Sequence, residues 1–197
     1  ELLEVPSQLI SRADYTERFP DGEVLSRETG HDRPYGSNPY TGYDDVNQPP
    51  FALQDVELDG RLSPKARVVS IQQGDALVAV PFDLREDEVV LNVPVVRRPV
   101  VLWWREGPTS ALGADQIADS RDVGSVVVYE RRAGGQVLTF AADRDVMVDA
   151  ETGSRWNVSG TAVSGPLRGE RLKPVVHDTP FWFAVGAFHP DARIVTA

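Results

Sequence analysis

A succession of short β-branched runs, beginning at Arg67 and continuing to the end of the chain, most constrains what this sequence can fold into. Turn signals separate the runs, among them Gly74-Asp75, Ala133-Gly134-Gly135 and Thr152-Gly153. Runs of this kind between Gly, Pro and Asp residues are typical of strands, and patterns with a helical period are few. The sequence therefore predicts a mainly β domain, a β-rich barrel or sandwich with a few short helices and minor α+β content.

Two short helices are expected near the ends of the chain. Ser11 is a good N-cap for a helix through Phe19. Near the C-terminus, Asp178 or Thr179 is expected to cap a helix whose first position is Pro180 and whose apolar body is FWFAVGAF. Residues 192–197 are then expected to form a terminal strand.

Four further local features are predicted from the residues. Residues 23–26 are predicted to form a short strand, and Asp59-Gly60 a hairpin turn. The runs VGSVVVYER and QVLTFAA are predicted to pair as a hairpin around Ala133-Gly134-Gly135. Trp103 and Trp104 are adjacent on a predicted strand, so their side chains point to opposite faces. We expect one in the core and the other covered by the tyrosine–proline loop or by a partner.

The tyrosine–proline loop, residues 26–51, holds three tyrosines and four prolines and has neither a helical period nor a period of two. Long ordered loops in compact domains are often functional. Three interpretations stay open: a folded strap without a ligand, a binding loop, and the cover of an active site. The ligand-binding candidates are Arg33, Tyr35, Tyr40, Tyr43 and Asp45. The weak catalytic candidates are Glu28, His31, Asp44 and Arg121.

Several classes of chemistry find little support in the residues. There is no cysteine, which excludes disulfides and thiolate chemistry. A Gly-x-Ser-x-Gly nucleophile elbow is absent. The three histidines, His31, His177 and His189, show no metal-ligand spacing. We therefore expect no metal site and no cofactor.

Negative charge is concentrated in the first third of the chain. Residues 1–60 carry 13 acidic and 4 basic side chains, and residues 61–197 carry 17 and 16. This balance argues against nucleic acid as a partner, because phosphate-backbone binding needs a basic face. An acidic face is either simply solvated or attracts a basic partner. No apolar run approaches the roughly 18 residues of a transmembrane helix.

The two ends of the chain resemble each other. The start reads SRADYTERFPDGEVLS and the end reads HDTPFWFAVGAFHPDARIVT. Each predicts a short capped helix with aromatic residues, then Pro-Asp, then a short strand. Residues 1–26 are therefore predicted to be the tail of a preceding repeat, and residues 61–197 a complete β-rich repeat. Residues 27–60 form the long connecting loop between them.

Several strings together resemble a known family. They are DGEVLSRETGHDRPYGSNPYTGYDD, PPF, RDVGS, DAETGSRWN, GPLRGERLKP and FWFAVGAFHPD. They cover nearly the whole chain, which resembles the C-terminal half of the bacterial and archaeal family called domain of unknown function 3179. The resemblance implies an exported or lipid-anchored protein built from two related halves, and therefore an extracytoplasmic or cell-surface location.

This chain departs from the pattern of the family's first half. That half typically carries a Tyr-Cys-Pro-Leu-Cys-like motif and an upstream His-Glu segment. Here the corresponding places are taken by Leu102-Trp103-Trp104-Arg105 and by residues 84–92, which include no histidine. Any chemistry of that motif does not transfer to this chain.

The sequence thus favours a non-catalytic binding or assembly module of an exported two-repeat protein. Self-association or a protein partner would use the N-terminal arm and the loop. The alternative is an enzyme, hydrolase-like or metal-assisted, with a pocket under residues 27–51 that uses carboxylates, His31 and arginines.

Overall fold

A computed structural model describes residues 4–51, 53, 57–86 and 89–196. The structure is mostly β, which confirms the predicted class. The helices are α1 (Arg12–Arg18), α2 (Trp182–Phe188) and the 3-10 turns η1 (Phe82–Glu86) and η2 (Ile117–Asp119). The strands are β1 (Val68–Gln73), β2 (Ala76–Pro81), β3 (Val90–Val95), β4 (Arg98–Arg105), β5 (Ser125–Glu130), β6 (Arg132–Ala133), β7 (Gln136–Val137), β8 (Phe140–Asp143), β9 (Val146–Asp149), β10 (Arg155–Trp156), β11 (Ala162–Ser164), β12 (Lys173–Pro174) and β13 (Arg193–Ile194).

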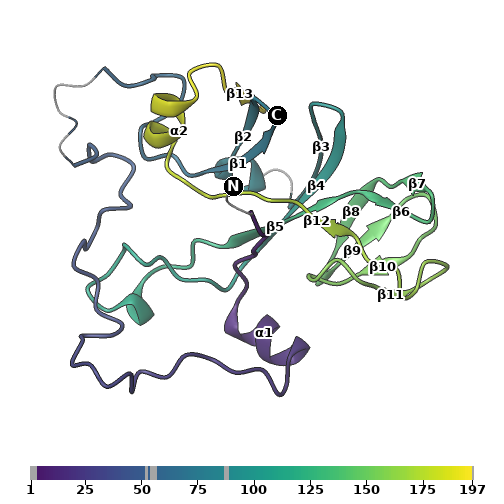
Figure 1. Cartoon of the computed structure of the whole chain (residues 1–197), viewed down its shortest axis with the longest axis horizontal. Coiled ribbons are helices and arrows are strands. Elements are labelled where there is room, and N and C mark those ends of the chain that lie inside the picture. The colour runs from purple at the N-terminus through teal and green to yellow at the C-terminus, as the bar shows by residue number, and fades with distance from the viewer. Residues whose placement is uncertain (1–3, 52, 54–56, 87–88, 197) are drawn as a thin grey trace.

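A central antiparallel sheet in the order β12-β5-β4-β3 lies between two smaller sheets (Figure 1). One face packs on the sheet β1-β2-β13, in which β13 pairs with β2 in parallel. The other face packs on the sheet β11-β10-β9-β8. The layers follow from the strict alternation of side chains along each strand.

Strand β4 shows this alternation most clearly. Leu102 and Trp104 belong to the cluster shared with the β1–β2 hairpin, and Trp103 belongs to the cluster on the opposite face. Trp104 meets Phe82 edge-on at 6.5 Å between ring centroids. Both tryptophans are buried by neighbouring strands. The prediction that the loop or a partner covers one of them is therefore wrong.

Helix α2 covers the outer face of the β1–β2 hairpin, where Trp182 and Val185 pack on Val68, Leu77 and Ala79. The helix begins at Trp182 after the N-cap Phe181, and no side chain caps it. The prediction of a cap at residue 178 or 179 is wrong.

The late start has a backbone cause. The carbonyls of Asp178 and Pro180 accept hydrogen bonds from the N–H groups of Ser70 and Val68, at 2.9 and 3.0 Å. The chain before α2 is therefore held extended along the edge of β1.

Near the N-terminus, one local prediction is confirmed and two are wrong. Ser11 caps α1, and its Oγ accepts the Asp14 N–H at 3.0 Å. Residues 23–26 are not a strand, because they pair with no strand among the described residues. Residues 57–66 form no hairpin at Asp59-Gly60. The Asp59 carboxylate instead forms a salt bridge with the guanidinium of Arg61, with 2.6 Å between Oδ2 and Nη2.

Later turns agree better with the sequence. Gly74-Asp75 joins β1 to β2, and Thr152-Gly153 lies between β9 and β10, as predicted. The hairpin around Gly134-Gly135 is shorter than predicted, because β5 pairs with β4 and β12 and leaves only β6 and β7 to pair with each other. The predicted terminal strand over residues 192–197 is confirmed in part, as β13 (Arg193–Ile194), and Ala197 lies outside the described residues. No helix in the described part of the chain is long and apolar enough to cross a membrane.

Candidate functional site

The loop of residues 26–51 forms turns, with no helix or strand, and runs along one side of the molecule (Figure 1). It docks on a second loop, residues 107–124. The Asn38 N–H donates to the Asp115 carbonyl at 2.7 Å, and the Asn38 side-chain amide donates to the Ala114 carbonyl at 3.0 Å. The Gly42 N–H donates to the Leu112 carbonyl at 2.8 Å. Two loops distant in sequence therefore form one ordered platform.

Asp44 is the polar centre of this platform, with only 7% of its surface exposed. Its carboxylate accepts the Ser110 hydroxyl at 2.5 Å and the Arg121 guanidinium at 3.1 Å. Burial by itself raises the pKa of Asp44. The hydrogen bonds from Ser110 and Arg121, together with the Arg121 charge, outweigh burial and hold that pKa below its ordinary value.

Beside Asp44, Tyr43 packs on a buried lysine. Lys65 is 1% exposed, and its Nζ donates to the Tyr43 carbonyl at 2.7 Å. The same Nζ lies 4.5 Å from the centre of the Tyr43 ring, which is a cation–π contact. Tyr43 also stacks on Phe51 at 4.2 Å and meets Phe181 edge-on at 6.0 Å. This aromatic packing fixes the loop over the start of β1.

A cavity of about 410 Å³ opens at the base of the loop. Its wall combines three cationic side chains, two carboxylates and an apolar part. The lining residues include Lys65, Arg67, Arg121, Asp44, Asp83, Val46, Ala66, Phe82, Val123 and Phe181. The wall carries three positive and two negative side chains, of which Asp44 and Arg121 pair with each other, so it has a small excess of positive charge in a chain of net charge −10.

The structure separates the sequence-predicted residues into two groups. Asp44 and Arg121 meet and line the cavity. Glu28, His31 and Arg33 are exposed on the loop and do not line it. Among the described residues, no hydrogen bond or ion pair joins the side chains of these three to Asp44 or Arg121. The expected convergence of all these side chains does not occur.

The other predicted ligand-binding residues of the loop differ in their contacts. Tyr40 lies 6.0 Å from Phe51, so it borders the Tyr43 cluster. The hydroxyl groups of Tyr35 and Thr29 form a hydrogen bond of 2.6 Å within the loop. Asp45 accepts the Asn47 N–H at 2.9 Å and closes a turn. The hydrogen bond to Asn47 is the main cause that lowers the pKa of Asp45.

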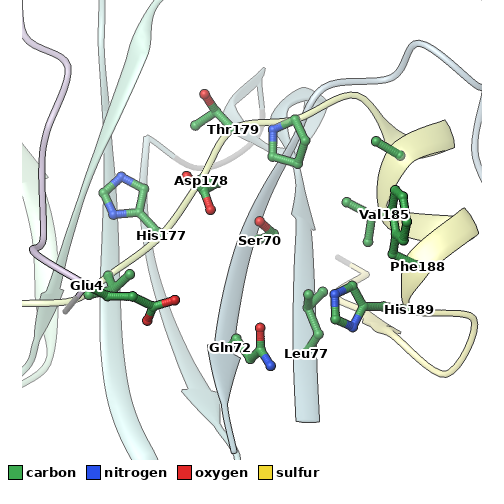
Figure 2. Close-up of a pocket in the computed structure, with 13 residues that line it drawn as sticks. Glu4, Ser70, Gln72, Leu77, His177, Asp178, Thr179, Val185, Phe188 and His189 are labelled. Carbon is green, nitrogen blue, oxygen red and sulfur yellow. The ribbon is translucent and has the colours of Figure 1, made fainter. Parts of the chain in front are cut away.

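A second cavity, of about 560 Å³, lies between the edge of β1 and helix α2 (Figure 2). His177 and His189 stand on opposite sides of it, with Ser70 and Gln72 between them (Figure 2). The His177 Nδ1 contacts the Val175 carbonyl at 2.9 Å. Within the described part of the chain, no group of three or more His, Asp or Glu side chains is placed to hold a metal ion.

Sequence reasoning missed Lys65 and Ser110. Ser110 carried no motif, and its partner Asp44 is distant in sequence. Lys65 did carry a signal, since it is one of two lysines in a chain with eighteen arginines. The lysine ammonium is a compact charge on a flexible stem, so it fits a small closed space beside an aromatic ring. The guanidinium of arginine is broader and planar and needs more room.

The fold and the platform define the protein as a mostly β module with an ordered loop site. The chain belongs to the family described as Protein of unknown function (DUF3179), whose model matches residues 1–192. No curated protein and no solved structure matches it.

The family strings have visible structural roles here. In GYDD, Asp44 joins the two loops. In RDVGS, Asp122 accepts the N–H groups of Gly107 and Gly124 at 2.6 and 2.7 Å. In DAETGSRWN, Asp149 accepts the Trp156 indole N–H at 2.9 Å. These carboxylates fix turns and loops.

Proposed function

We propose that this chain is a non-catalytic binding module, and that the cavity under the loop takes a small organic anion with an apolar or aromatic part. One observation carries the proposal. The Lys65 ammonium is almost fully buried at the cavity wall, and its hydrogen-bond partner is a neutral carbonyl. In the described part of the chain, no carboxylate lies within salt-bridge distance of it.

The physical argument starts from the cost of burial. A buried ammonium is costly unless paired or well hydrogen-bonded, and it has three N–H donors. The Tyr43 carbonyl accepts one of them, and the Tyr43 ring faces the charge. The Asp45 carboxylate interacts electrostatically with Lys65 without forming a salt bridge, and a bound carboxylate or phosphate would supply an opposite charge in direct contact with the ammonium. Phe82, Phe181 and the other apolar lining residues suit the remainder of such a ligand.

The alternative, an enzyme that uses Glu28 and His31, receives less support. A general acid or base must come within hydrogen-bond reach of the bound substrate. Both side chains are exposed on the loop and neither lines the cavity. The strap interpretation explains the docking of the loop and gives Lys65 an anchoring role at Tyr43, but it supplies no opposite charge in contact with the buried ammonium.

The test is isothermal titration calorimetry with benzoate and phenyl phosphate as probes. Benzylamine, protonated at neutral pH, is the charge-reversed control of similar size. We expect saturable binding of an anion with a dissociation constant on the order of millimolar, as a ligand of so few atoms allows. The control should not bind.

Variants then localise the binding. Lys65→Met should weaken anion binding by about tenfold or more, because the aliphatic stem remains and the charge is lost. The matched control is Lys173→Met, which removes the other lysine at an exposed position of β12 and should leave binding unchanged. Equal loss in both variants, or no anion binding at all, would refute the proposal. Release of phenol from phenyl phosphate would instead favour the enzyme.

A further inference from the structure

Two distant segments of the chain have the same local structure. Helices α1 and α2 have seven residues each. The residues that follow them, Phe19 and His189, have nearly the same backbone angles, φ −124° and ψ 72° against φ −135° and ψ 69°. Each donates its N–H to the carbonyl four residues earlier, Tyr15 or Val185, at 2.8 Å.

The likeness continues past the helices. Pro20-Asp21 and Pro190-Asp191 follow in the same register. The Gly22 N–H then donates to the Phe19 carbonyl at 2.8 Å, and the Ala192 N–H donates to the His189 carbonyl at 2.9 Å. A sequence likeness alone would not reproduce these angles and hydrogen bonds at matched positions. The two segments are therefore the same helix–turn unit.

The surroundings of the next residues differ sharply. In the same register, Val24 corresponds to Ile194 and Leu25 to Val195. Ile194 belongs to β13, and the Val195 N–H donates to the Ala79 carbonyl of β2 at 2.9 Å. By contrast, Val24 is 67% exposed and Leu25 fully exposed. Ile194 is half-buried and Val195 is buried, whereas their counterparts Val24 and Leu25 are left in solvent.

The first unit is nevertheless held in place. Asp14 of α1 pairs with Arg105 of β4 at 3.2 Å. The Tyr15 hydroxyl donates to the Glu23 carbonyl at 2.8 Å, which fixes the chain just before Val24. The side chains of Val24 and Leu25 therefore face solvent from a fixed segment. An ordered row of exposed apolar side chains next to a formed helix is typical of an interaction surface.

We propose that residues 11–25 form the closing unit of a second domain of this same fold, in which Val24 and Leu25 supply the third strand. The partner is an antiparallel hairpin of the β1–β2 type with a vacant edge on its second strand, to which residues 23–25 add in parallel as β13 adds to β2.

The hairpin of this chain cannot be that partner. β13 occupies the edge of β2, and residues 178–181 lie along the edge of β1. The proposal does not rest on the anion site, because it involves different residues and a different face.

A second copy of the chain can stand in for the partner once its edge is vacated. The double variant I194G/V195G weakens β13 and leaves α2 in place. We expect sedimentation velocity to show concentration-dependent association of this variant, and the same conditions to leave the wild-type chain unchanged. Near-UV circular dichroism of the four tryptophans checks that the variant is folded. Should it unfold, the milder variant V195G replaces it with the same expectation.

The association must depend on the displayed strand. Adding V24D and L25D should lower the association constant by about tenfold or more, because charges would enter an apolar contact. The matched control, V137D, changes an exposed valine of β7 and should leave association intact. A folded variant that stays monomeric would overturn the proposal. So would association that persists equally with V24D and L25D.

Discussion

At the scale of single residues, Asp44 joins two loops, and its partner Ser110 lies 66 positions further along the chain. Its carboxylate is stabilised in the ionised form by Ser110 and Arg121 despite its burial. A carboxyl group whose pKa is lower in the folded chain stabilises the fold above its unfolded pKa, near 3.9. That contribution is lost as the pH falls through the lower, folded pKa.

We therefore expect Asp44→Asn to lower the free energy of unfolding at neutral pH by about 1–2 kcal/mol, because the charge-assisted hydrogen bonds to Ser110 and to the exposed Arg121 are lost. The difference from wild type should shrink as the pH falls below about 4. Urea unfolding across this pH range measures it. Asp32→Asn, at an exposed position of the same loop, should stay within about 0.5 kcal/mol of wild type. A difference that does not change with pH would contradict the assigned charge effect.

At the scale of elements, the turn of the β3–β4 hairpin has an unusual backbone conformation. β3 and β4 are joined by Val96-Arg97, since Val95 pairs with Arg98. Val96 has φ 56°, a left-handed conformation that is uncommon for any residue with a Cβ atom and most strained for a β-branched one. Gly74, at the matching position between β1 and β2, has φ 61° without that strain.

Replacing Val96 by glycine should therefore stabilise the chain by about 0.5–1 kcal/mol, because the relieved strain exceeds the added backbone entropy of the unfolded state. Thermal unfolding followed by far-UV circular dichroism measures the gain. Arg97→Gly, at the next turn position where φ is not positive, should give no such gain. Equal effects of both changes would indicate that glycine acts through flexibility alone.

At the scale of the whole molecule, the central sheet is shared by two cores. Trp104 packs on the β1–β2 side and Trp103 on the side of β8 to β11. If either outer sheet separates from the central sheet, one face of β4 becomes exposed to solvent. The layered arrangement therefore favours one cooperative unfolding transition over two.

Trp103→Ala and Trp104→Ala should each lower the free energy of unfolding by about 3–5 kcal/mol, because each leaves a large cavity in a buried cluster. Differential scanning calorimetry should show one transition in wild type and in both variants, with calorimetric and van't Hoff enthalpies in agreement. Two separated transitions, with each tryptophan affecting only one, would show that the two cores unfold independently.

The β class, the turns at Gly74-Asp75 and Thr152-Gly153, and the cap at Ser11 can all be predicted from the residues alone. These features follow from local preferences and the alternation of side chains. Only the tertiary structure decided which edges pair. Val24 and Ile194 belong to matching units, and only Ile194 finds a neighbouring strand.

Only some residues of the candidate site can be predicted from the sequence. Asp44 lies in a loop rich in functional residue types, and Arg121 precedes a predicted buried strand, so both are candidates from sequence. Glu28 and His31 are candidates by the first criterion as well, although they do not line the cavity. The burial of Lys65 against Tyr43 and the Asp44–Ser110 contact join residues far apart in the chain. Such pairs depend on how the loops fold back over β1, and no local pattern records that.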